Sequence, residues 1–593
     1  MPKSASVSTV STQQIMTNGN PRIIDVKPGE EPDRAIPHSF EYGDTYIHGT
    51  CYDRDAPREW DLNASASDMP YLTYVKLLST SWPTLRHLAD FMEVGTSPLQ
   101  WRYIKDKNGP GEERDVRIKR TKVTFIEYQP KTAPQSMRID AVESAPGRIG
   151  LKEKLHKLTH EADKEPPLRL FVVEDLSREV IESLGARFDV DPLFFREHIE
   201  DYVWYNTRDP WAAPPSLTSS IKQRSWFRLR NMRLRYHKDK ESFKAAQWEA
   251  NDWNVLRRPD NDNNHWAHKD ELHAIVSIMR TRSTIWIGKD SKCGDGTVGI
   301  ILLDPSLKSG KPLWHDRSNW LPTTSMEASP PKVELSKSWY EDIVRMTTVY
   351  PWFEVNKGRE IQPQVLAYPA LYTICAEWLL VCDYVKTRLS QIEWEVEMPD
   401  VFRHQDDTRS KSEVIDDSLQ RLHTWRRHIP VFRDMVDEAV QQALPAANRL
   451  TAHLKTASSP AEAFEEIVPD FDRIRKLLEE LQDRVDRLTS VVTSEISVRD
   501  SRQGIEDNHN LARLTWLATI FIPLSFVSAF FSMNESVSAL KYTYGWFFLT
   551  AVPFTGICLA IAQLAGGGAL GRKTMKKELK QKGSSFYSKV RFK

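Results

Sequence analysis

The hydrophobic positions of this chain follow three different patterns along its length. Residues 168–174 and 298–303 are short apolar runs rich in Val, Ile, Leu and Phe, which is typical of buried strands. Between residues 464 and 492, apolar side chains recur every three or four positions, which indicates a long helix that buries one face. After Leu514 the chain becomes almost uniformly apolar. These patterns predict an α+β domain, then a helical region, then an apolar C-terminal part.

The N-terminal 165 residues carry the weakest pattern. Residues 1–65 are polar and rich in Pro and Asp, and we expect this segment to be disordered. Residues 71–92 have helical spacing, with Pro83 expected to split the helix into two pieces. Residues 116–128 alternate as a strand does. We therefore set apart residues 66–165 as a divergent N-terminal region.

Residues 166–335 have the pattern of an α/β domain. The run LRLFVVEDLS predicts a buried strand that leads into a helix capped by Ser177 and ending near Gly185. A second helix is expected to begin at Pro192, because proline favours the first turn. Further strands are predicted at residues 226–236, 284–288 and 298–303.

Residues 336–510 are predicted to be helical. One helix is expected over residues 369–394 and another over residues 412–444, interrupted at Pro430. The long helix that follows carries an apolar stripe, opposite a face of Glu, Asp, Arg and Lys. Its members are Phe464, Ile467, Phe471, Ile474, Leu478, Leu481, Val485, Leu488 and Val492. This pattern fits a stalk helix, and equally an ordinary bundle or coiled-coil helix.

Two apolar segments near the C-terminus are long enough to cross a membrane. The first, residues 514–531, has 18 residues without a charge, and the second covers residues 544–565. A helix rises ~1.5 Å per residue, so about 20 residues span a ~30 Å hydrocarbon core. We predict transmembrane helices at 511–533 and 544–566, joined by an outer loop at 534–543. A hairpin buried in a soluble domain is the alternative.

Charge determines the predicted orientation. The tail at residues 567–593 has a single acid, Glu578, among many basic residues. Those residues are Arg572, Lys573, Lys576, Lys577, Lys580, Lys582, Lys589, Arg591 and Lys593. Basic flanks stay on the cytosolic side, so both termini are expected in the cytosol, and the tail is expected to contact membrane lipid. The plasma membrane is favoured over the mitochondrial inner membrane, because the Ser/Thr-rich N-terminus has no arginine before Arg22.

Composition excludes several classes of protein. The 81 basic and 81 acidic residues cancel, so bulk charge gives no reason to expect nucleic acid as a partner. The five cysteines form no CxxC pair, which argues against a disulfide framework or a zinc site. The chain has no GxxxxGK[ST], GxSxG or HExxH motif. We expect neither an enzyme nor a resident cofactor.

Two spans in one chain cannot enclose an aqueous path, so a conducting protein would have to be an oligomer. The first span is the better candidate to line such a path, because it is rich in hydroxyl side chains. These are Thr515, Thr519, Ser525, Ser528 and Ser532. Hydroxyls in membrane helices also bond back to their own helix or to neighbouring helices, and residue types alone do not separate these two interpretations.

The stretch NHNLARLTWLATIFIPLSFVSAFFSMN, residues 508–534, resembles the end of the stalk helix and the first span of the CorA-type magnesium transporters. The shared features are an Asn before the membrane, Leu-Thr at the entry, the block ATIFIPLSF and a closing Met-Asn. The run LRLFVVEDLS…LGARFDVDPLFFREHI is similar, more loosely, to the start of that family's cytosolic domain. The resemblance implies a homopentameric channel for divalent cations.

The resemblance also implies roles for particular residues. Asn534 corresponds to the asparagine at the outer mouth, where its amide would hold a hydrated metal ion through water. Asn508 corresponds to a polar ring at the inner entrance, and Ser525 to a hydroxyl ring within the pore. Leu511, Leu514 and Ile522 correspond to a hydrophobic constriction that gates by dewetting. Independently, positions 511, 514/515, 518, 522, 525, 529 and 532 share one helical face.

The chain departs from the family's Gly-Met-Asn signature, which here reads Ser532-Met533-Asn534. Serine adds bulk where glycine allows close packing. In the outer loop Glu535 is the only acid available to attract cations. These departures leave open which divalent ion is moved, Mg²⁺ or another. They also motivate an alternative, a non-conducting membrane-anchored scaffold or sensor with the same architecture.

Overall fold

The computed structural model describes two compact units, residues Met1–Thr489 and Ser490–Lys593, each of which is treated by itself. Within them the described residues are 13–17, 20–24, 69–95, 111–129, 133–142, 149–158, 168–200, 216–257, 259–263, 273–313, 319–320, 326, 338–348, 363–398, 411–452, 462–533 and 542–565.

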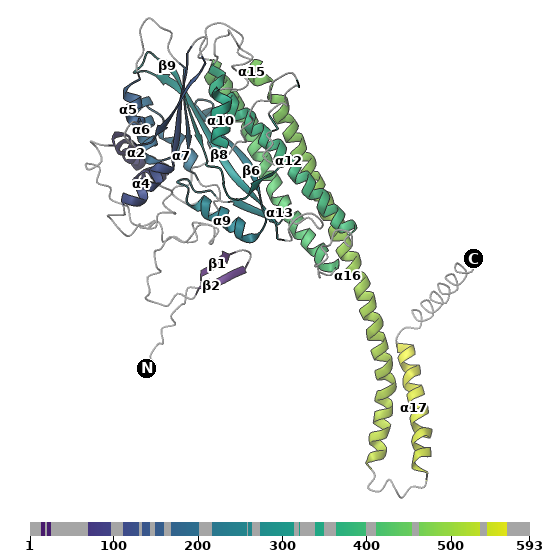
Figure 1. Ribbon diagram of the computed structural model, residues 1–593. Coiled ribbons are helices and arrows are strands. Elements are labelled where there is room, and N and C mark those ends of the chain that lie inside the picture. Colours follow the sequence, from purple (N-terminus) through teal and green to yellow (C-terminus); the bar gives the residue numbers. More distant parts are fainter. Residues whose placement is uncertain are drawn as a thin grey trace, which may run out of the picture. The chain divides into compact units, whose positions relative to one another are not determined.

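The first unit is built on one mixed sheet, of which β6, β8 and β9 are labelled in Figure 1. Its strand order is β10-β6-β8-β9-β5-β3-β4, and β7 pairs with β8 beside this path. The strands are β3 (Lys122–Tyr128), β4 (Gln135–Asp140), β5 (Leu168–Glu174), β6 (Trp226–His237), β7 (Pro259–Asn263), β8 (Ile275–Asp290), β9 (Gly296–Leu303) and β10 (Lys311–Pro312). β5 and β9 pair in parallel, whereas the other described pairs are antiparallel.

Short helices cover one face of the sheet. They are α2 (Pro70–Ser81), the 3-10 turn η1 (Pro83–Leu85), α3 (Arg86–Val94), α5 (Leu151–His156), α6 (Arg178–Phe188) and α7 (Pro192–Ile199). Alternate residues of the central strands, such as Phe171, Val173 and Ile300, join these helices in the main hydrophobic core. The alternation arises because successive side chains of a strand point to opposite faces.

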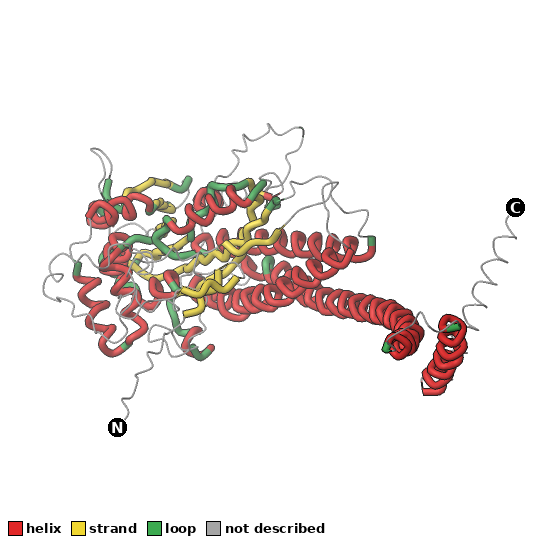
Figure 2. The backbone as a smooth tube through the Cα atoms, turned by 90° about the horizontal axis from the view of Figure 1, so that it is seen from below, coloured by secondary structure: helices red, strands yellow, loops and turns green. Residues whose placement is uncertain are grey.

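Longer helices cover the other face, as Figures 1 and 2 show. They are α10 (Trp339–Thr348), α12 (Tyr368–Glu397), α13 (Lys411–Glu438), the π-helix η5 (Ala439–Ala443) and α14 (Leu444–Ala452), with the 3-10 turn η4 (Pro363–Leu366). The approach is close at Gly299, where an added Cβ would lie 3.0 Å from Leu366 of η4. A larger residue at position 299 would push η4 away from β9.

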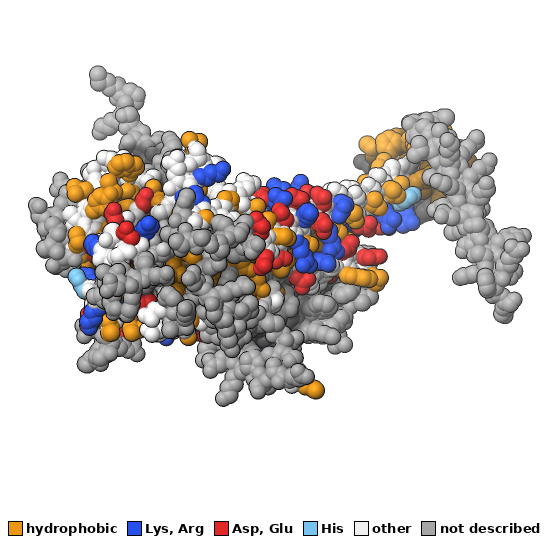
Figure 3. All heavy atoms as spheres, turned by 90° about the horizontal axis from the view of Figure 1, so that it is seen from above, with side chains coloured by type: hydrophobic (Ala, Val, Ile, Leu, Met, Phe, Trp, Pro, Cys, Tyr) orange, Lys and Arg blue, Asp and Glu red, His pale blue; other side chains and the backbone are white. Residues whose placement is uncertain are grey.

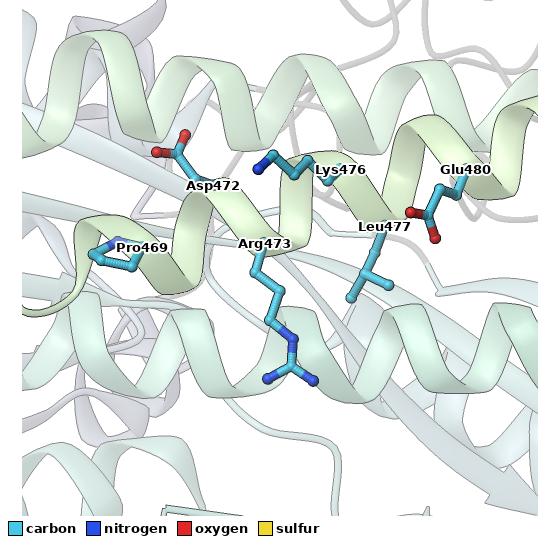
Figure 4. Close-up of a pocket in the computed structure, with 6 residues that line it drawn as sticks. All are labelled: Pro469, Asp472, Arg473, Lys476, Leu477 and Glu480. Atoms are coloured by element: carbon cyan, nitrogen blue, oxygen red, sulfur yellow. The ribbon is translucent and has the colours of Figure 1, made fainter.

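The remaining helices are α4 (Gly111–Arg120), α8 (Thr218–Ile221), α9 (Lys240–Asn251), α15 (Glu462–Glu465), α16 (Val468–Ser532) and α17 (Thr543–Ala565). α16 is one continuous helix of 65 residues. The predicted stripe begins at the buried Phe464 of α15 and continues in α16, where Phe471, Leu478 and Val485 are buried and Leu488 is half-buried. The opposite face carries Asp472, Arg473, Lys476 and Glu480, whose side chains border a shallow hollow together with Pro469 and Leu477 (Figure 4).

The predicted fold class is confirmed: an α/β domain, long helices and two C-terminal apolar helices. Several local expectations were right as well. Pro83 separates α2 from α3, Asp191 caps α7 just before Pro192, and α12 begins beside Pro369. Each of these boundaries follows from the fixed φ of proline or from a side chain that caps a helix.

Other expectations need correction. Residues 116–120 belong to α4 rather than to a strand, because Val116 faces solvent while the adjacent Arg117 and Ile118 are both buried, which is not the alternation of a strand. α6 passes Gly185 and ends at Phe188, whose side chain packs in the core, with Asp189 in the left-handed conformation after it. α13 continues through Pro430, held by the buried neighbours Ile429 and Phe432.

The segment 1–65, for which we expected disorder, contains an antiparallel hairpin of β1 (Gln13–Thr17) and β2 (Asn20–Ile24). That expectation therefore does not hold for these ten residues. The rest of the segment lies outside the described residues, as do the outer loop from Asn534 to Lys541 and the basic tail from residue 566 onward.

Candidate functional site

The second unit contains the two apolar helices that the sequence predicted. The apolar part of α16 has a mean hydropathy of 1.9 over its best window, and residues Gly545–Ala562 of α17 reach 1.8. Only 11% of each window is buried. A helix from the core of a soluble protein would be mostly buried, so exposure favours membrane-spanning helices over the soluble alternative. Where this hairpin is visible in Figure 3, many of its side chains are hydrophobic, whereas acidic and basic side chains mix along the long helices.

α16 and α17 pack against each other antiparallel. The rings of Phe531 and Phe547 lie 6.1 Å apart, and those of Phe526 and Phe554 lie 6.0 Å apart. Small or compact side chains are buried beside these pairs. Pro523 and Val527 of α16 and Ala551 and Thr555 of α17 are buried. Small residues allow membrane helices to approach closely, which is why this face is the intramolecular one.

The residues predicted to line a pore lie on the other side of α16. At about 100° per residue, Ser525 is turned roughly half a turn away from both Pro523 and Val527. Leu511, Leu514 and Ile522 have exposed fractions of 59%, 63% and 67%. In a single chain, therefore, this face has no protein neighbour among the described residues.

The hydroxyl groups of this helix donate to the backbone of their own helix. Thr515 Oγ1 donates to the carbonyl of Leu511 at 2.8 Å, and Thr519 donates to that of Thr515 at 2.7 Å. Ser525 Oγ donates to the carbonyl of Phe521 at 2.8 Å. These are the hydrogen bonds to the helix's own backbone that the sequence could not distinguish from a pore-lining role. Each of them uses the hydroxyl hydrogen, and the oxygen lone pairs of exposed Ser525 still face outward as acceptors.

The remaining predicted residues lie at the two ends of the apolar segment. Asn508 is an exposed residue of α16, six positions before Leu514. Ser532 is the last residue of the helix, and Met533 follows it with its side chain exposed. Asn534 and Glu535 lie outside the described residues.

The described residues contain no group of three or more His, Cys, Asp or Glu side chains placed to hold a metal ion. An ion passing this face would meet hydroxyl, amide and alkyl groups. Such a lining suits an ion that keeps its water shell better than one that exchanges water for carboxylates.

A polar cluster that the sequence analysis missed lies at the end of β9. Asp304 accepts hydrogen bonds from Arg257 Nε at 2.8 Å and from the backbone N–H of Arg282 at 2.7 Å. His198 Nε2 lies 3.5 Å from the other Asp304 oxygen, and its Nδ1 lies 3.1 Å from Thr284 Oγ1. Burial and the two arginines hold the pKa of His198 well below its usual range. All five residues are buried, so the cluster joins α7 to the sheet and offers a substrate no access.

Asp175 occupies the equivalent place after the parallel strand β5. It is buried at a φ of 60°, and one carboxylate oxygen accepts the backbone N–H of Asn254 at 2.9 Å. Its own carbonyl accepts Thr121 Oγ1, so Asp175 connects three segments of the domain. Burial raises the pKa of its carboxyl to about 7. The only sequence signal for either aspartate is that it directly follows a buried strand.

Together, the α/β domain, the long helix and the two exposed apolar helices define an integral membrane protein with two spans at its C-terminus. Residues 341–564 match the family described as CorA-like Mg2+ transporter protein. The matched region runs from α10 to α17 and so includes both spans. Over this region the chain is similar to the CorA-type family, as the stretch 508–534 led us to expect.

Two solved structures are similar over most of their length. One is "The complete structure of CorA magnesium transporter from Methanocaldococcus jannaschii", with 13% identity, 74% of this chain and 97% of that chain covered, and a TM-score of 0.26. The other is "structure of the full-length CmaX protein", with 10% identity, coverage of 75% and 97%, and a TM-score of 0.34. Neither is close enough in shape to support a conclusion about this chain. No curated protein sequence matches.

Proposed function

We propose that this protein passively transports divalent cations, Mg²⁺ first among them, through an oligomeric pore lined by the apolar part of α16. The observation that carries the proposal is the family match over residues 341–564, because it includes both spanning helices and names Mg²⁺ transport. The uncharged, exposed face of α16 supports it, since that face is the one not used for packing against α17.

The pore must form between copies of the chain, and we propose a pentamer. A single pair of helices has no interior through which a hydrated ion could pass. The exposed face of α16 carries Leu511, Leu514, Ile522 and Ser525. If several copies turn this face toward a common axis, the contact of α16 with α17 within each chain stays on the outside of the pore. The exposed alkyl groups at positions 511, 514 and 522 then form a hydrophobic constriction, which closes by losing water.

At the outer end, we propose that Asn534 binds the ion through water. Mg²⁺ dehydrates reluctantly, so an amide that accepts and donates hydrogen bonds can hold its first water shell. Ser532 and Met533 complete this filter, and Glu535 attracts cations to it. Asn508 forms the corresponding polar ring at the inner end.

The driving force is the electrochemical gradient. The membrane potential contributes ~2.3 kcal/mol per charge per 100 mV, and about twice that for a divalent ion. With both termini in the cytosol, as the basic tail favours, a negative interior draws cations inward. The plasma membrane, which maintains such a potential, is the proposed location.

The test is Mg²⁺ flux into liposomes that contain the full-length protein and an indicator dye. We expect uptake that grows with an inside-negative potential and is strongly reduced in Asn534→Ala. The control is His509→Ala, which removes an exposed polar side chain from the side of α16 opposite Leu511 and Ser525. Equal flux in the native protein, both variants and empty liposomes would contradict transport and favour the scaffold alternative. That alternative also expects Ser532→Gly to change nothing.

A further inference from the structure

The outer edge of β4 is open over most of its length. β4 is the last strand of its sheet, and among the described residues β3 is the only strand that pairs with it. On the other side of β4 a single bridge joins Asp140 to Gly150. Residues 135–138 are all exposed. This edge therefore presents a row of unpaired backbone N–H and C=O groups, to which another strand can add.

The N-terminal hairpin of β1 and β2 is a two-stranded sheet, with no third strand among the described residues. Two residues, Asn18 and Gly19, lie between the paired Thr17 and Asn20, and Asn-Gly is the pair favoured in two-residue hairpin turns. A hairpin of two strands is at best marginally stable in water. The hairpin thus has a strong local signal in the sequence and requires a further strand to be stable.

The two edges of the hairpin are not equivalent. Beside a two-residue turn the flanking residues, Thr17 and Asn20, form a hydrogen-bonded pair, and such pairs alternate along the ladder. The backbone groups of the next pair, Met16 and Pro21, therefore point outward. Proline has no N–H, so the outer edge of β2 is interrupted at Pro21, whereas that of β1 offers the backbone groups of Gln14 and Met16. β1 is the strand that can pair further.

The open edges of β1 and β4 match in length. β1 has five residues, which is the length of the open stretch 135–139 of β4. With Ile15 opposite Met137, the two stretches coincide at both ends whichever way β1 runs. Met137 is 40% exposed, whereas Ile139 is buried in the core, so apolar surface at the centre of the open edge is left uncovered.

The chain itself holds the hairpin near this edge. Residues 25–68 connect Ile24 to the start of α2, and Leu72 of α2 belongs to the same hydrophobic core as Ile139 of β4. A chain of about 44 residues can span up to about 150 Å, so β1 can reach β4. Such a tether gives an effective concentration of the order of millimolar, which a separate molecule would have to match. The hairpin of the same chain is therefore favoured as the added strand.

We propose that β1 pairs with the open edge of β4, so that the N-terminal hairpin extends the sheet of its own chain in the order β3-β4-β1-β2. Ile15 lies opposite Met137, and β2 becomes the new edge strand. Proline on an edge strand hinders further pairing, so Pro21 then protects the sheet from adding strands of other molecules. This interaction is independent of the transport proposed above.

Disulfide cross-linking of the full-length chain tests this pairing. I15C/M137C places thiols on the two paired strands, and I15C/T80C is its matched control, because Thr80 is exposed on α2, close to the end of the tether. Both variants also carry Cys51→Ser and Cys558→Ser, since the other native thiols are buried. We expect a mild oxidant to form the disulfide within one chain about tenfold faster in the first variant, since disulfides need Cβ atoms about 4 Å apart. Equal rates, or a bond between two chains, would overturn the proposal.

Hydrogen exchange provides a second measurement, which does not depend on the register. Gly19→Val opposes the positive φ that an Asn-Gly turn requires, whereas Gly19→Asn is compatible with it, because asparagine tolerates that conformation. We expect amide exchange in residues 135–139 to become about tenfold faster in Gly19→Val and to stay at the native rate in Gly19→Asn. The amides of the central strand β8 should not respond to either change. Native exchange of residues 135–139 in Gly19→Val would show that the hairpin does not cover β4.

Discussion

At the scale of single residues, Asp175 is the group whose ionisation matters most to the cytosolic domain. It is buried, it accepts the backbone N–H of Asn254, and its surroundings raise its pKa to about 7. The cause is burial, which disfavours the charged carboxylate. The carboxyl of Asp175, which links β5 to the loop after α9, therefore changes its protonation state near neutral pH.

This arrangement makes the stability of the domain depend on pH. The folded state binds the proton more tightly than the unfolded state, so the stabilisation is complete below the ordinary aspartate pKa and is lost as pH rises to about 7. The whole shift corresponds to about 4 kcal/mol. Asp175→Asn should therefore melt later than the native protein at pH 8 and not at pH 5.

The matched control for that measurement is Asp295→Asn. Asp295 also has a positive φ, 55°, but it is exposed. Thermal melts of the purified full-length chain at the two pH values give the comparison. The measured quantity is the difference in melting temperature between the native protein and Asp175→Asn. If this difference is the same at pH 5 and at pH 8, Asp175 does not titrate in this range.

At the scale of elements, the buried stripe of α16 is expected to hold the helical layer together. Phe471 is fully buried, and Lys476, one turn further along, is on the outward face shown in Figure 4. Phe471→Ala should cost about 3–5 kcal/mol, because it leaves a cavity in a packed core. Lys476→Ala should change the free energy of unfolding by less than about 0.5 kcal/mol.

Limited proteolysis and thermal melting of these two variants measure the difference. We expect Phe471→Ala to be cleaved faster and to melt earlier, while Lys476→Ala behaves as the native protein does. If the two variants were equally stable, the stripe would not be the packing face of this helix.

The elements that the sequence predicted are those in which one physical signal dominates. The three-and-four spacing identified α16, and apolar runs identified β5 and β9. β4 was missed because four of its six residues are exposed, and β7 because its residues, PDNDN, are those of a loop. Tertiary contacts determine such strands: β7 is held as a strand by pairing with β8, and Asp262 on it binds Arg388 of α12.

Pro430 and the π-helix show the limit of local rules in helices. Proline removes one backbone hydrogen bond, yet α13 continues through it because its neighbours are buried. The π-helix Ala439–Ala443 ends two residues before Pro445, whose ring displaces the carbonyl of residue 441 from regular helical bonding. Glu438, at its start, is held by Arg228 at 2.6 Å. The sequence shows the proline, but it does not show the contact between Glu438 and Arg228 that makes the irregular turn tolerable.

At the scale of the whole molecule, the assignment of a pore-lining face to α16 stays a prediction. The residues 511, 514, 522 and 525 do share an exposed side of α16, opposite the α17 contact. The sequence could not distinguish hydroxyls that bond back from hydroxyls that line a path, since both leave the same pattern. It also could not show that copies of the chain surround an axis, because that contact lies between molecules.

The central claim is that the face of Ser525 lines the ion path, and thiol blocking tests it most directly. In liposomes, a variant with Ser525→Cys is compared with one carrying Val527→Cys, which is buried against α17. Both also carry Cys558→Ser, which removes the native thiol of α17. We predict that a membrane-impermeant thiol reagent stops Mg²⁺ flux in the first and leaves it unchanged in the second. Flux that survives modification at position 525, or that stops equally in both variants, would contradict the account.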